Sequence, residues 1–183
     1  DGGGDDSVVR VSSSSTVSMS GFTIQGGSQS EGAGIYIDTA GFRCVSYDPE
    51  TTLVTVCAGT TWLDILEVLA PEGRAVKVMQ SNSDFSVGGT LSVNAHGWQN
   101  GSPPVASTVR SMQVLTADGE VVRASREHNA ELFRHVLGGY GLFGIILEAT
   151  LETAPDTVYQ AEQEELDLSL LAARWAELEA GGA

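Results

Sequence analysis

Two glycine-rich segments carry the residue types best suited to hold a phosphorylated cofactor. Residues 20–29 read SGFTIQGGSQ, and residues 80–97 read QSNSDFSVGGTLSVNAHG. Small side chains let a ligand approach the backbone closely, and backbone N–H groups can donate to phosphate oxygens without adding positive charge. The spacing alone leaves two interpretations open, a cofactor site or two structural loops.

Other motifs that could carry chemistry are absent or stand in the wrong context. Residues 139–144 (GYGLFG) match G-x-G-x-x-G, but they follow an expected helix and lead into an expected strand. A pyrophosphate at a helix N-terminus needs the reverse order, so we interpret this stretch as a tight turn. His96, His128 and His135 are too scattered for a metal motif, and we expect no metal site.

Cys44 and Cys57 are the only two cysteines, and they flank a turn expected at residues 48–52. A hairpin centred on that turn places the two residues one step away from a direct cross-strand pair. A slip of one residue reverses the face of a strand, so we expect two neighbouring thiols that are not bonded. The compartment stays open, with the reducing cytoplasm favoured.

The composition limits the partners. The chain has 183 residues, with 42% hydrophobic and 18% charged residues, which is typical of one globular domain or two small lobes. The chain has nine Lys and Arg residues and 24 Asp and Glu residues, which gives a net charge of −15. Nucleic acids and anionic membranes need a basic surface, so we expect neither as a partner. No apolar run is long enough to span a bilayer, and we recognise no leader segment.

The hydrophobic pattern predicts an α+β fold, with about nine short strands linked mostly by hairpins. The strands are expected at residues 8–11, 17–20, 34–38, 42–47, 53–57, 76–79, 111–116, 121–123 and 144–151. Three helices are expected at residues 61–69, after an N-cap at Thr60, and at residues 129–137 and 160–179. Residues 21–34 and 80–101 are expected to be loops.

The second glycine-rich segment resembles the flavin-binding core of FAD-binding domains of the vanillyl-alcohol-oxidase type, also called the p-cresol methylhydroxylase (PCMH) type. The members most similar to it are sugar-lactone, alditol and decaprenylphosphoryl-ribose oxidases. Further blocks resemble the family in the right order, at residues 56–62 (VCAGTTW), 117–121 (ADGEV), 131–133 (ELF) and 138–146 (GGYGLFGII). The resemblance implies an FAD-binding domain over residues 7–156, with a small parallel lobe and a larger, mostly antiparallel sheet lobe. Residues 157–183 would begin a helical C-terminal region.

The resemblance also assigns cofactor contacts. The loop around the FAD pyrophosphate would consist of Gly21, Phe22, Thr23, Ile24, Gln25, Gly26, Gly27 and Ser28. The isoalloxazine and phosphate side would be contacted by Ser81, Ser86, Val87, Gly88 and Gly89. The flavin would be lined by Val93, Asn94, Ala95, His96 and Gly97, and the adenine end would be received by the backbone of Ile145.

Three departures from the family pattern qualify these assignments. Many relatives carry a histidine bonded to the flavin where this chain has Ile24, so we expect a non-covalent flavin. Only residues 12–16 separate the first two expected strands, where the family has a helix, so the parallel lobe is expected to be shortened. The family's substrate domain is missing from residues 157–183, so the catalytic residues are unknown and a further domain or second chain would complete the site.

Two functions follow from the resemblance. The first is the FAD-binding part of an oxidoreductase that removes a hydride from a C–OH carbon of a small sugar, polyol or lactone. The alternative is a truncated or degenerate domain that serves as a binding or scaffold module without catalysis. Flavin colour distinguishes them, because only the first requires bound FAD.

Overall fold

The computed structural model describes residues 8–11, 15–18, 23–26, 35–98 and 101–181. Its largest part is a six-stranded sheet in which every strand pair is antiparallel. The order is β5-β6-β10-β8-β9, and β7 also pairs with β10. The strands are β5 (Val45–Asp48), β6 (Leu53–Cys57), β7 (Arg74–Val76), β8 (Val109–Leu115), β9 (Val121–Ser125) and β10 (Ile145–Pro155).

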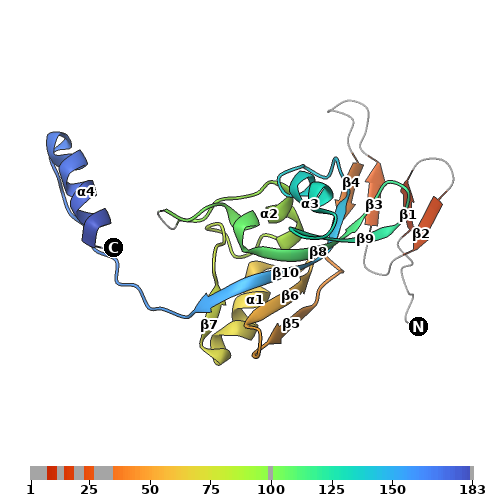
Figure 1. Ribbon diagram of the computed structural model, residues 1–183, viewed down its shortest axis with the longest axis horizontal. Coiled ribbons are helices and arrows are strands. Elements are labelled where there is room, and N and C mark those ends of the chain that lie inside the picture. Colours follow the sequence, from red (N-terminus) through yellow and green to blue (C-terminus); the bar gives the residue numbers. More distant parts are fainter. Residues whose placement is uncertain (1–7, 12–14, 19–22, 27–34, 99–100, 182–183) are drawn as a thin grey trace.

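Strand β10 lies between β6 and β8 in this sheet and also pairs with β7 (Figure 1). It pairs with β6, β7 and β8, and so joins segments that lie about 90 residues apart in the sequence, such as Thr55 and Thr150. Its buried residues include Ile146, Ala149 and Leu151. The strand continues to Pro155, beyond the predicted end at residue 151, because β7 pairs with its last three residues.

Within the described residues, four α-helices and three short 3₁₀ segments accompany the strands. They are α1 (Trp62–Leu69), α2 (Val87–Ser92), α3 (Ala130–Val136) and α4 (Leu171–Gly181), with η1 (Ala70–Glu72), η2 (Val105–Thr108) and η3 (Leu168–Leu170). The core contains Trp62, Ile65 and Leu69 of α1 together with Val87 and Leu91 of α2, all with no exposed surface. The prediction of an α+β fold with a mostly antiparallel sheet and short helices is therefore confirmed.

The N-cap of helix α1 lies one residue later than predicted, at Thr61 and not at Thr60. The N-cap is Thr61, whose hydroxyl accepts from the Asp64 N–H over 3.2 Å, while the Asp64 carboxylate accepts from the Thr61 N–H over 2.9 Å. This reciprocal capping box requires an acid three residues after the cap, which Thr60 lacks. Thr60 is instead buried, and its hydroxyl donates to the Cys44 carbonyl over 2.9 Å.

Helix α2 lies inside the stretch predicted to be a loop. The pair Gly88-Gly89 has low helix propensity, so the sequence pattern gives no helical signal there. The helix forms because Ser86 caps it and because tertiary contacts satisfy its first N–H groups. Val87 N donates to the Thr60 carbonyl, and Gly88 N donates to the Ala58 carbonyl, both over 2.8 Å.

The N-terminal strands correct the predicted parallel lobe. β1 (Val8–Val11) pairs antiparallel with β2 (Ser15–Ser18), and β3 (Thr23–Gly26) pairs antiparallel with β4 (Ile35–Asp38). The three residues between β1 and β2 are too few for the crossover that parallel neighbours need, so a hairpin results. β3 also places a strand within the stretch predicted to be the first loop.

The two cysteines form a disulfide, which corrects the prediction of free thiols. Asp48 is itself the last residue of β5 and lies opposite Leu53, so the turn contains four residues and not five. The register therefore shifts by one, and Cys44 lies directly opposite Cys57, with the Cα atoms 5.0 Å apart.

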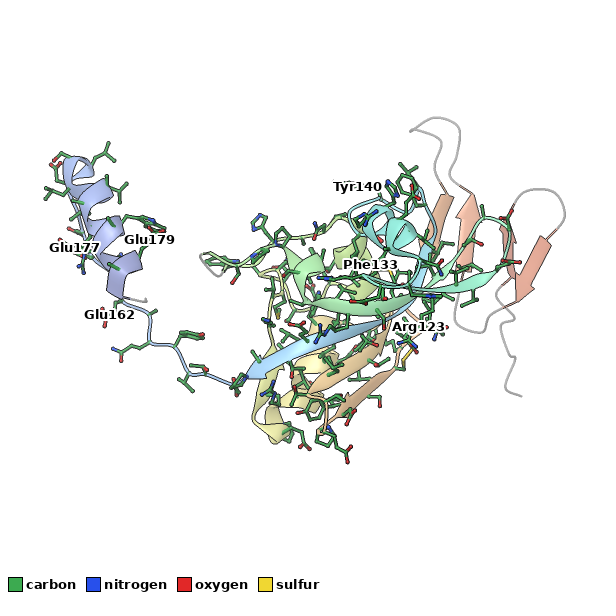
Figure 2. The ribbon with its side chains drawn as sticks, in the orientation of Figure 1. Arg123, Phe133, Tyr140, Glu162, Glu177 and Glu179 are labelled. Atoms are coloured by element: carbon green, nitrogen blue, oxygen red, sulfur yellow. A yellow bond between two sulfur atoms is a disulfide. The ribbon has the colours of Figure 1, made fainter. Side chains whose placement is uncertain are left out.

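The C-terminal helix is shorter than the predicted 160–179. Residues 158–167 form no helix or strand, and only η3 and α4 follow. Figure 1 shows α4 well away from the sheet, and Figure 2 shows Glu177 and Glu179 among its side chains. No helix in the described part of the chain has the length and apolar character needed to cross a membrane.

Candidate cofactor site

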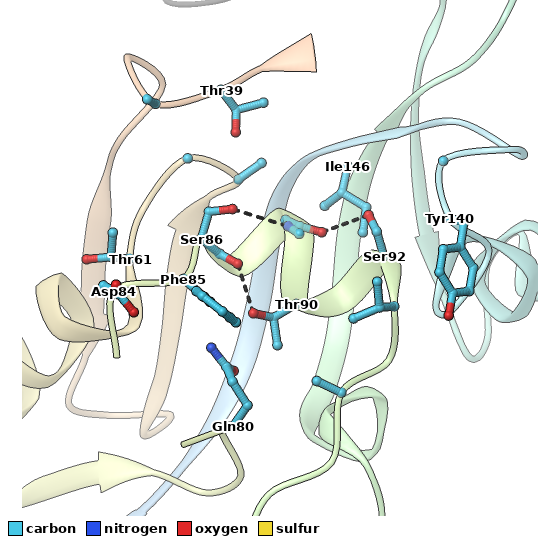
Figure 3. A pocket seen from close by; sticks show the side chains of 18 of the residues that line it. Thr39, Thr61, Gln80, Asp84, Phe85, Ser86, Thr90, Ser92, Tyr140 and Ile146 are labelled. Atoms are coloured by element: carbon cyan, nitrogen blue, oxygen red, sulfur yellow. Dashed lines mark hydrogen bonds between the residues drawn. The ribbon is translucent and has the colours of Figure 1, made fainter. Parts of the chain in front are cut away.

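A cavity of about 1010 Å³ opens where four segments of the chain meet. They are the stretch after β4 (residues 39–43), the β6–α1 connection (residues 58–61), the segment containing α2 (residues 80–98), and the turn before β10 with the first two residues of that strand (residues 140–146). Figure 3 shows α2 and its cap Ser86 at the centre of this arrangement. Ligand sites commonly enclose about 300–1,000 Å³, so this cavity has room for a large cofactor.

Most of the residues assigned from the second glycine-rich segment surround this cavity. They are Ser81, Ser86, Gly88, Gly89, Val93, Ala95 and His96. Ile145, the residue assigned to the adenine end, also lines the cavity. Three assigned residues do not line it. Val87 is fully buried in the core, Asn94 accepts from the Ala106 N–H over 3.1 Å, and Gly97 lies outside the lining.

Only part of the first glycine-rich segment, residues 23–26, is described by the structure. Gly21, Phe22, Gly27 and Ser28 lie outside the described residues. Thr23, Ile24, Gln25 and Gly26 form β3, whose backbone pairs with β4 from Thr23 opposite Asp38 to Gly26 opposite Ile35.

Other parts of the lining were missed by the sequence reasoning. They are Thr39, Ala40, Arg43, Ala58, Gly59, Thr61, Gln80, Asp84, Phe85, Thr90, Ser92, Trp98, Tyr140, Gly141, Gly144 and Ile146. The block VCAGTTW could have predicted part of this wall, because its Gly59 permits a close backbone contact. Gly59 N donates to the Phe42 carbonyl over 3.0 Å, and a β-carbon on Gly59 would overlap the Thr39 carbonyl oxygen. The glycine thus allows residues 39–43 to form one wall.

The first turn of α2 does not offer free phosphate donors, contrary to the expectation for this segment. The N–H groups of Val87 and Gly88 donate to carbonyls near the end of β6, and that of Thr90 donates to the Ser86 carbonyl over 3.0 Å. The N–H of Gly89 donates to the Ser86 hydroxyl over 3.4 Å. The fold uses these donors, so the first turn of α2 shapes the cavity wall and does not present a set of free donors to an anion.

One charged side chain of the lining, that of Arg43, is also engaged. Arg43 Nε donates to the Ala40 carbonyl over 2.9 Å, and its Nη1 lies 3.6 Å from Asp64 Oδ2. The Thr61 N–H and, to a smaller extent, Arg43 lower the pKa of the Asp64 carboxyl below its ordinary value, against the opposing effect of burial. Arg43 is thus held by its own domain, and it is the sole Lys or Arg among the described lining residues.

The remaining lining is suited to a largely neutral ring system. Ala58, Phe85, Val93 and Ile146 give apolar surface. Gln80 Nε2 donates to the Asn82 carbonyl over 2.8 Å, which fixes the orientation of its amide, and Gln80 Oε1 is buried without a partner among the described residues. A buried acceptor without a donor is unfavourable, so the wall is better matched to a ligand that carries donors. The described residues contain no group of three His, Cys, Asp or Glu side chains that could hold a metal.

A family model described as an FAD binding domain matches residues 9–125, well over half of the chain. This chain belongs to the FAD-binding domain family. Its cofactor is therefore FAD, and the resemblance noted in the sequence is confirmed. The cavity of this FAD-binding domain lies partly within the matched range and partly beyond it, at residues 140–146.

Individual relatives support the same assignment. The domain is 40% identical over 115 residues to cytokinin dehydrogenase 5 of Arabidopsis thaliana, covering 60% of this chain and 21% of the relative. It is 34% identical over 140 residues to D-arabinono-1,4-lactone oxidase of Yarrowia lipolytica, covering 74% and 27%. It is 36% identical over 138 residues to decaprenylphosphoryl-beta-D-ribose oxidase of Mycolicibacterium smegmatis, covering 73% and 30%. The aligned part is under one third of each relative's length.

Proposed function

We propose that the cavity between α2 and the start of β10 holds the flavin of FAD, and that the domain serves an oxidoreductase acting on a C–OH group of a sugar, polyol or lactone. This substrate class is taken from the lactone oxidase and the ribose oxidase, which align with 74% and 73% of this chain. A cytokinin dehydrogenase aligns with 70% of it, so the substrate test below compares both classes.

Each part of the cavity wall would have a separate task. Gly89 presents no side chain, so the ligand could approach the α2 backbone, and Ala58 and Ile146 would contact the ring through apolar surface. Gln80 would present its amide to a polar ring edge. The pyrophosphate would be held by residues 21–28, the loop assigned to it by the family resemblance, since the first N–H groups of α2 are engaged within the fold. When bound, FAD supplies the ring that accepts the hydride.

We propose that the domain extends over residues 7–156. Strand β10 supports this boundary, since it pairs with β6, β7 and β8 up to Pro155. The described part of the C-terminal segment, residues 157–181, contributes no residue to the cavity lining. The acid–base groups for the reaction would come from a further domain or a second chain, since the titratable lining residues are few: Arg43, Asp84, His96 and Tyr140.

Titration with FAD tests cofactor binding by this chain. We expect the purified protein to be yellow, or to become so, with one FAD bound per chain and a raised melting temperature. A colourless protein whose melting temperature and absorbance do not respond to FAD would overturn the proposal and favour the scaffold module.

Anaerobic addition of substrates tests the substrate class, with the flavin-loaded domain assayed together with the further domain or second chain that supplies the acid–base groups. A sugar lactone or polyol is expected to bleach the flavin, and a cytokinin is the matched control. Bleaching by the cytokinin alone would overturn the proposed substrate class while leaving FAD binding intact.

A further inference from the structure

Tyr140 has a backbone conformation that its residue type rarely adopts. Its φ is +53°, within the left-handed region, where a β-carbon is crowded and glycine is the usual residue. The other positive-φ residues of the same turn are glycines, at positions 138, 141 and 144. A strained residue that persists in this setting calls for a compensating contact, often one with a ligand.

The fold itself does not provide that contact. The Tyr140 side chain is 73% exposed, so its ring gains little from burial. In contrast, Phe133 of the preceding helix α3 is 3% exposed and belongs to the core. The aromatic ring at position 140 is therefore not needed to complete the core of this domain.

The turn nevertheless holds Tyr140 in a fixed place. Its N–H donates to the Ser92 carbonyl over 2.9 Å, and the Gly138 N–H donates to the Leu91 carbonyl over 3.0 Å. Both acceptors lie at the C-terminal end of α2. These hydrogen bonds fix the backbone at Tyr140, and so the point at the cavity from which its ring extends, as preorganised binding residues require.

The ring borders the proposed flavin cavity, where Figure 3 shows it beside Ser92. Val93 and Trp98 line the same cavity and are 47% and 85% exposed. We propose that Tyr140 is a cofactor-binding residue that packs its ring against a planar ring of bound FAD, either the isoalloxazine or the adenine. This inference rests on the proposed function, because it requires FAD in the cavity.

Four variants of the whole chain test the role of the ring. Tyr140→Gly relieves the backbone strain and removes the ring, Tyr140→Leu keeps an apolar side chain, and Tyr140→Phe keeps the ring. The matched control is Leu142→Ala, since Leu142 is in the same turn and 83% exposed but does not line the cavity. Melting temperature without cofactor and FAD affinity by titration are measured for each.

We expect Tyr140→Gly to melt no lower than wild type while binding FAD about five- to hundredfold more weakly, the range for losing an aromatic stacking partner. Tyr140→Leu is expected to lose affinity as well, and Tyr140→Phe and Leu142→Ala to retain it. A change in the visible flavin spectrum between wild type and Tyr140→Leu identifies the isoalloxazine as the partner. An unchanged spectrum with reduced affinity identifies the adenine.

Three results overturn the inference and are distinguishable. If the wild-type chain binds FAD and Tyr140→Gly binds it equally well, the Tyr140 contact is wrong and the proposed function stands. If the wild-type chain does not bind FAD, both fall. A large fall in melting temperature for Tyr140→Gly, with unchanged affinity per folded molecule, also overturns the inference and makes the ring structural.

Discussion

The indole of Trp62 donates to the hydroxyl of Thr90 over 2.9 Å, and both residues are buried. Thr90 Oγ1 in turn donates to the Ser86 carbonyl over 2.9 Å. The first residue of α1 is therefore linked through α2 to the residue that caps α2. Thr90 also lines the cavity, so this link connects the core of the domain to the wall of the cofactor site.

Replacing Thr90 by Val should destabilise the domain by about 1–3 kcal/mol, because the buried Trp62 N–H loses its acceptor. Thr90→Ser keeps the hydroxyl and is the matched control, with a smaller loss from the missing methyl group. Urea unfolding followed by tryptophan fluorescence measures both. Equal stability of Thr90→Val and wild type would show that this hydrogen bond contributes nothing.

Gly88 and Gly89 should respond differently to alanine, although the sequence suggested one shared role. A β-carbon on Gly88 would lie 2.8 Å from Ala58 Cβ, so α2 must move and the domain should lose about 1–3 kcal/mol of stability. A β-carbon on Gly89 would meet only Ser86 Oγ, at 3.1 Å. Neither glycine has a positive φ, so neither substitution introduces backbone strain.

Gly89→Ala should therefore retain the stability of wild type and bind FAD more weakly, because the added methyl group enters the cavity wall. Thermal melting without cofactor and FAD titration separate the two effects. The placement of the cofactor against α2 is wrong if Gly89→Ala melts far below wild type with unchanged affinity per folded molecule.

Reducing the Cys44–Cys57 disulfide should lower the free energy of unfolding by about 3 kcal/mol, the value for a loop of about this length. The wall at residues 39–43 adjoins Cys44, so FAD affinity should also fall. The double variant Cys44→Ser/Cys57→Ser is the control, since reductant should change nothing further in it. Alkylation of both cysteines in the folded, unreduced protein would show that the bond does not form.

The capping carboxylate of Asp64 should make the domain less stable in acid. Its pKa is lowered in the folded state, so its contribution is present above the ordinary aspartate value of about 3.9 and is lost as the pH falls through the folded value. Asp64→Asn should cost about 0.3–1 kcal/mol near pH 7, from the lost charge at the N-terminus of α1.

At a pH below the folded value, Asp64→Asn and wild type should have the same stability, because the wild-type carboxyl is then protonated. Urea midpoints at several pH values give the comparison, with Asp84→Asn as a control on an exposed acid. A difference that stays constant down to the lowest pH would assign the effect to hydrogen bonding rather than charge.

The flavin should leave the protein on acid precipitation, since Ile24 offers no nucleophile where many relatives carry a histidine. Absorbance of the supernatant and of the washed pellet measures the partition. A pellet that stays yellow after repeated washing would indicate a covalent bond at another residue.

The sequence determined the family and much of the sheet. Alternating apolar residues marked β6, β8 and β9, and the Asp118-Gly119 turn joins β8 to β9 in the predicted hairpin. These signals are local, because side-chain alternation and turn residues act within about ten positions. The second glycine-rich segment was also recognisable from the sequence, because positions where the backbone packs closely require glycine or another small residue.

Tertiary structure decided the features that depend on distant partners. Helix α2 exists because the Ala58 and Thr60 carbonyls accept its first N–H groups, which no local pattern encodes. The Cys44–Cys57 bond depended on a register that a single turn residue shifts. Tyr140 lines the cavity because its turn is hydrogen-bonded to Ser92 at the end of α2, some 48 residues earlier in the sequence. Long-range hydrogen bonds and register are properties of the packed chain, so a local pattern does not specify them.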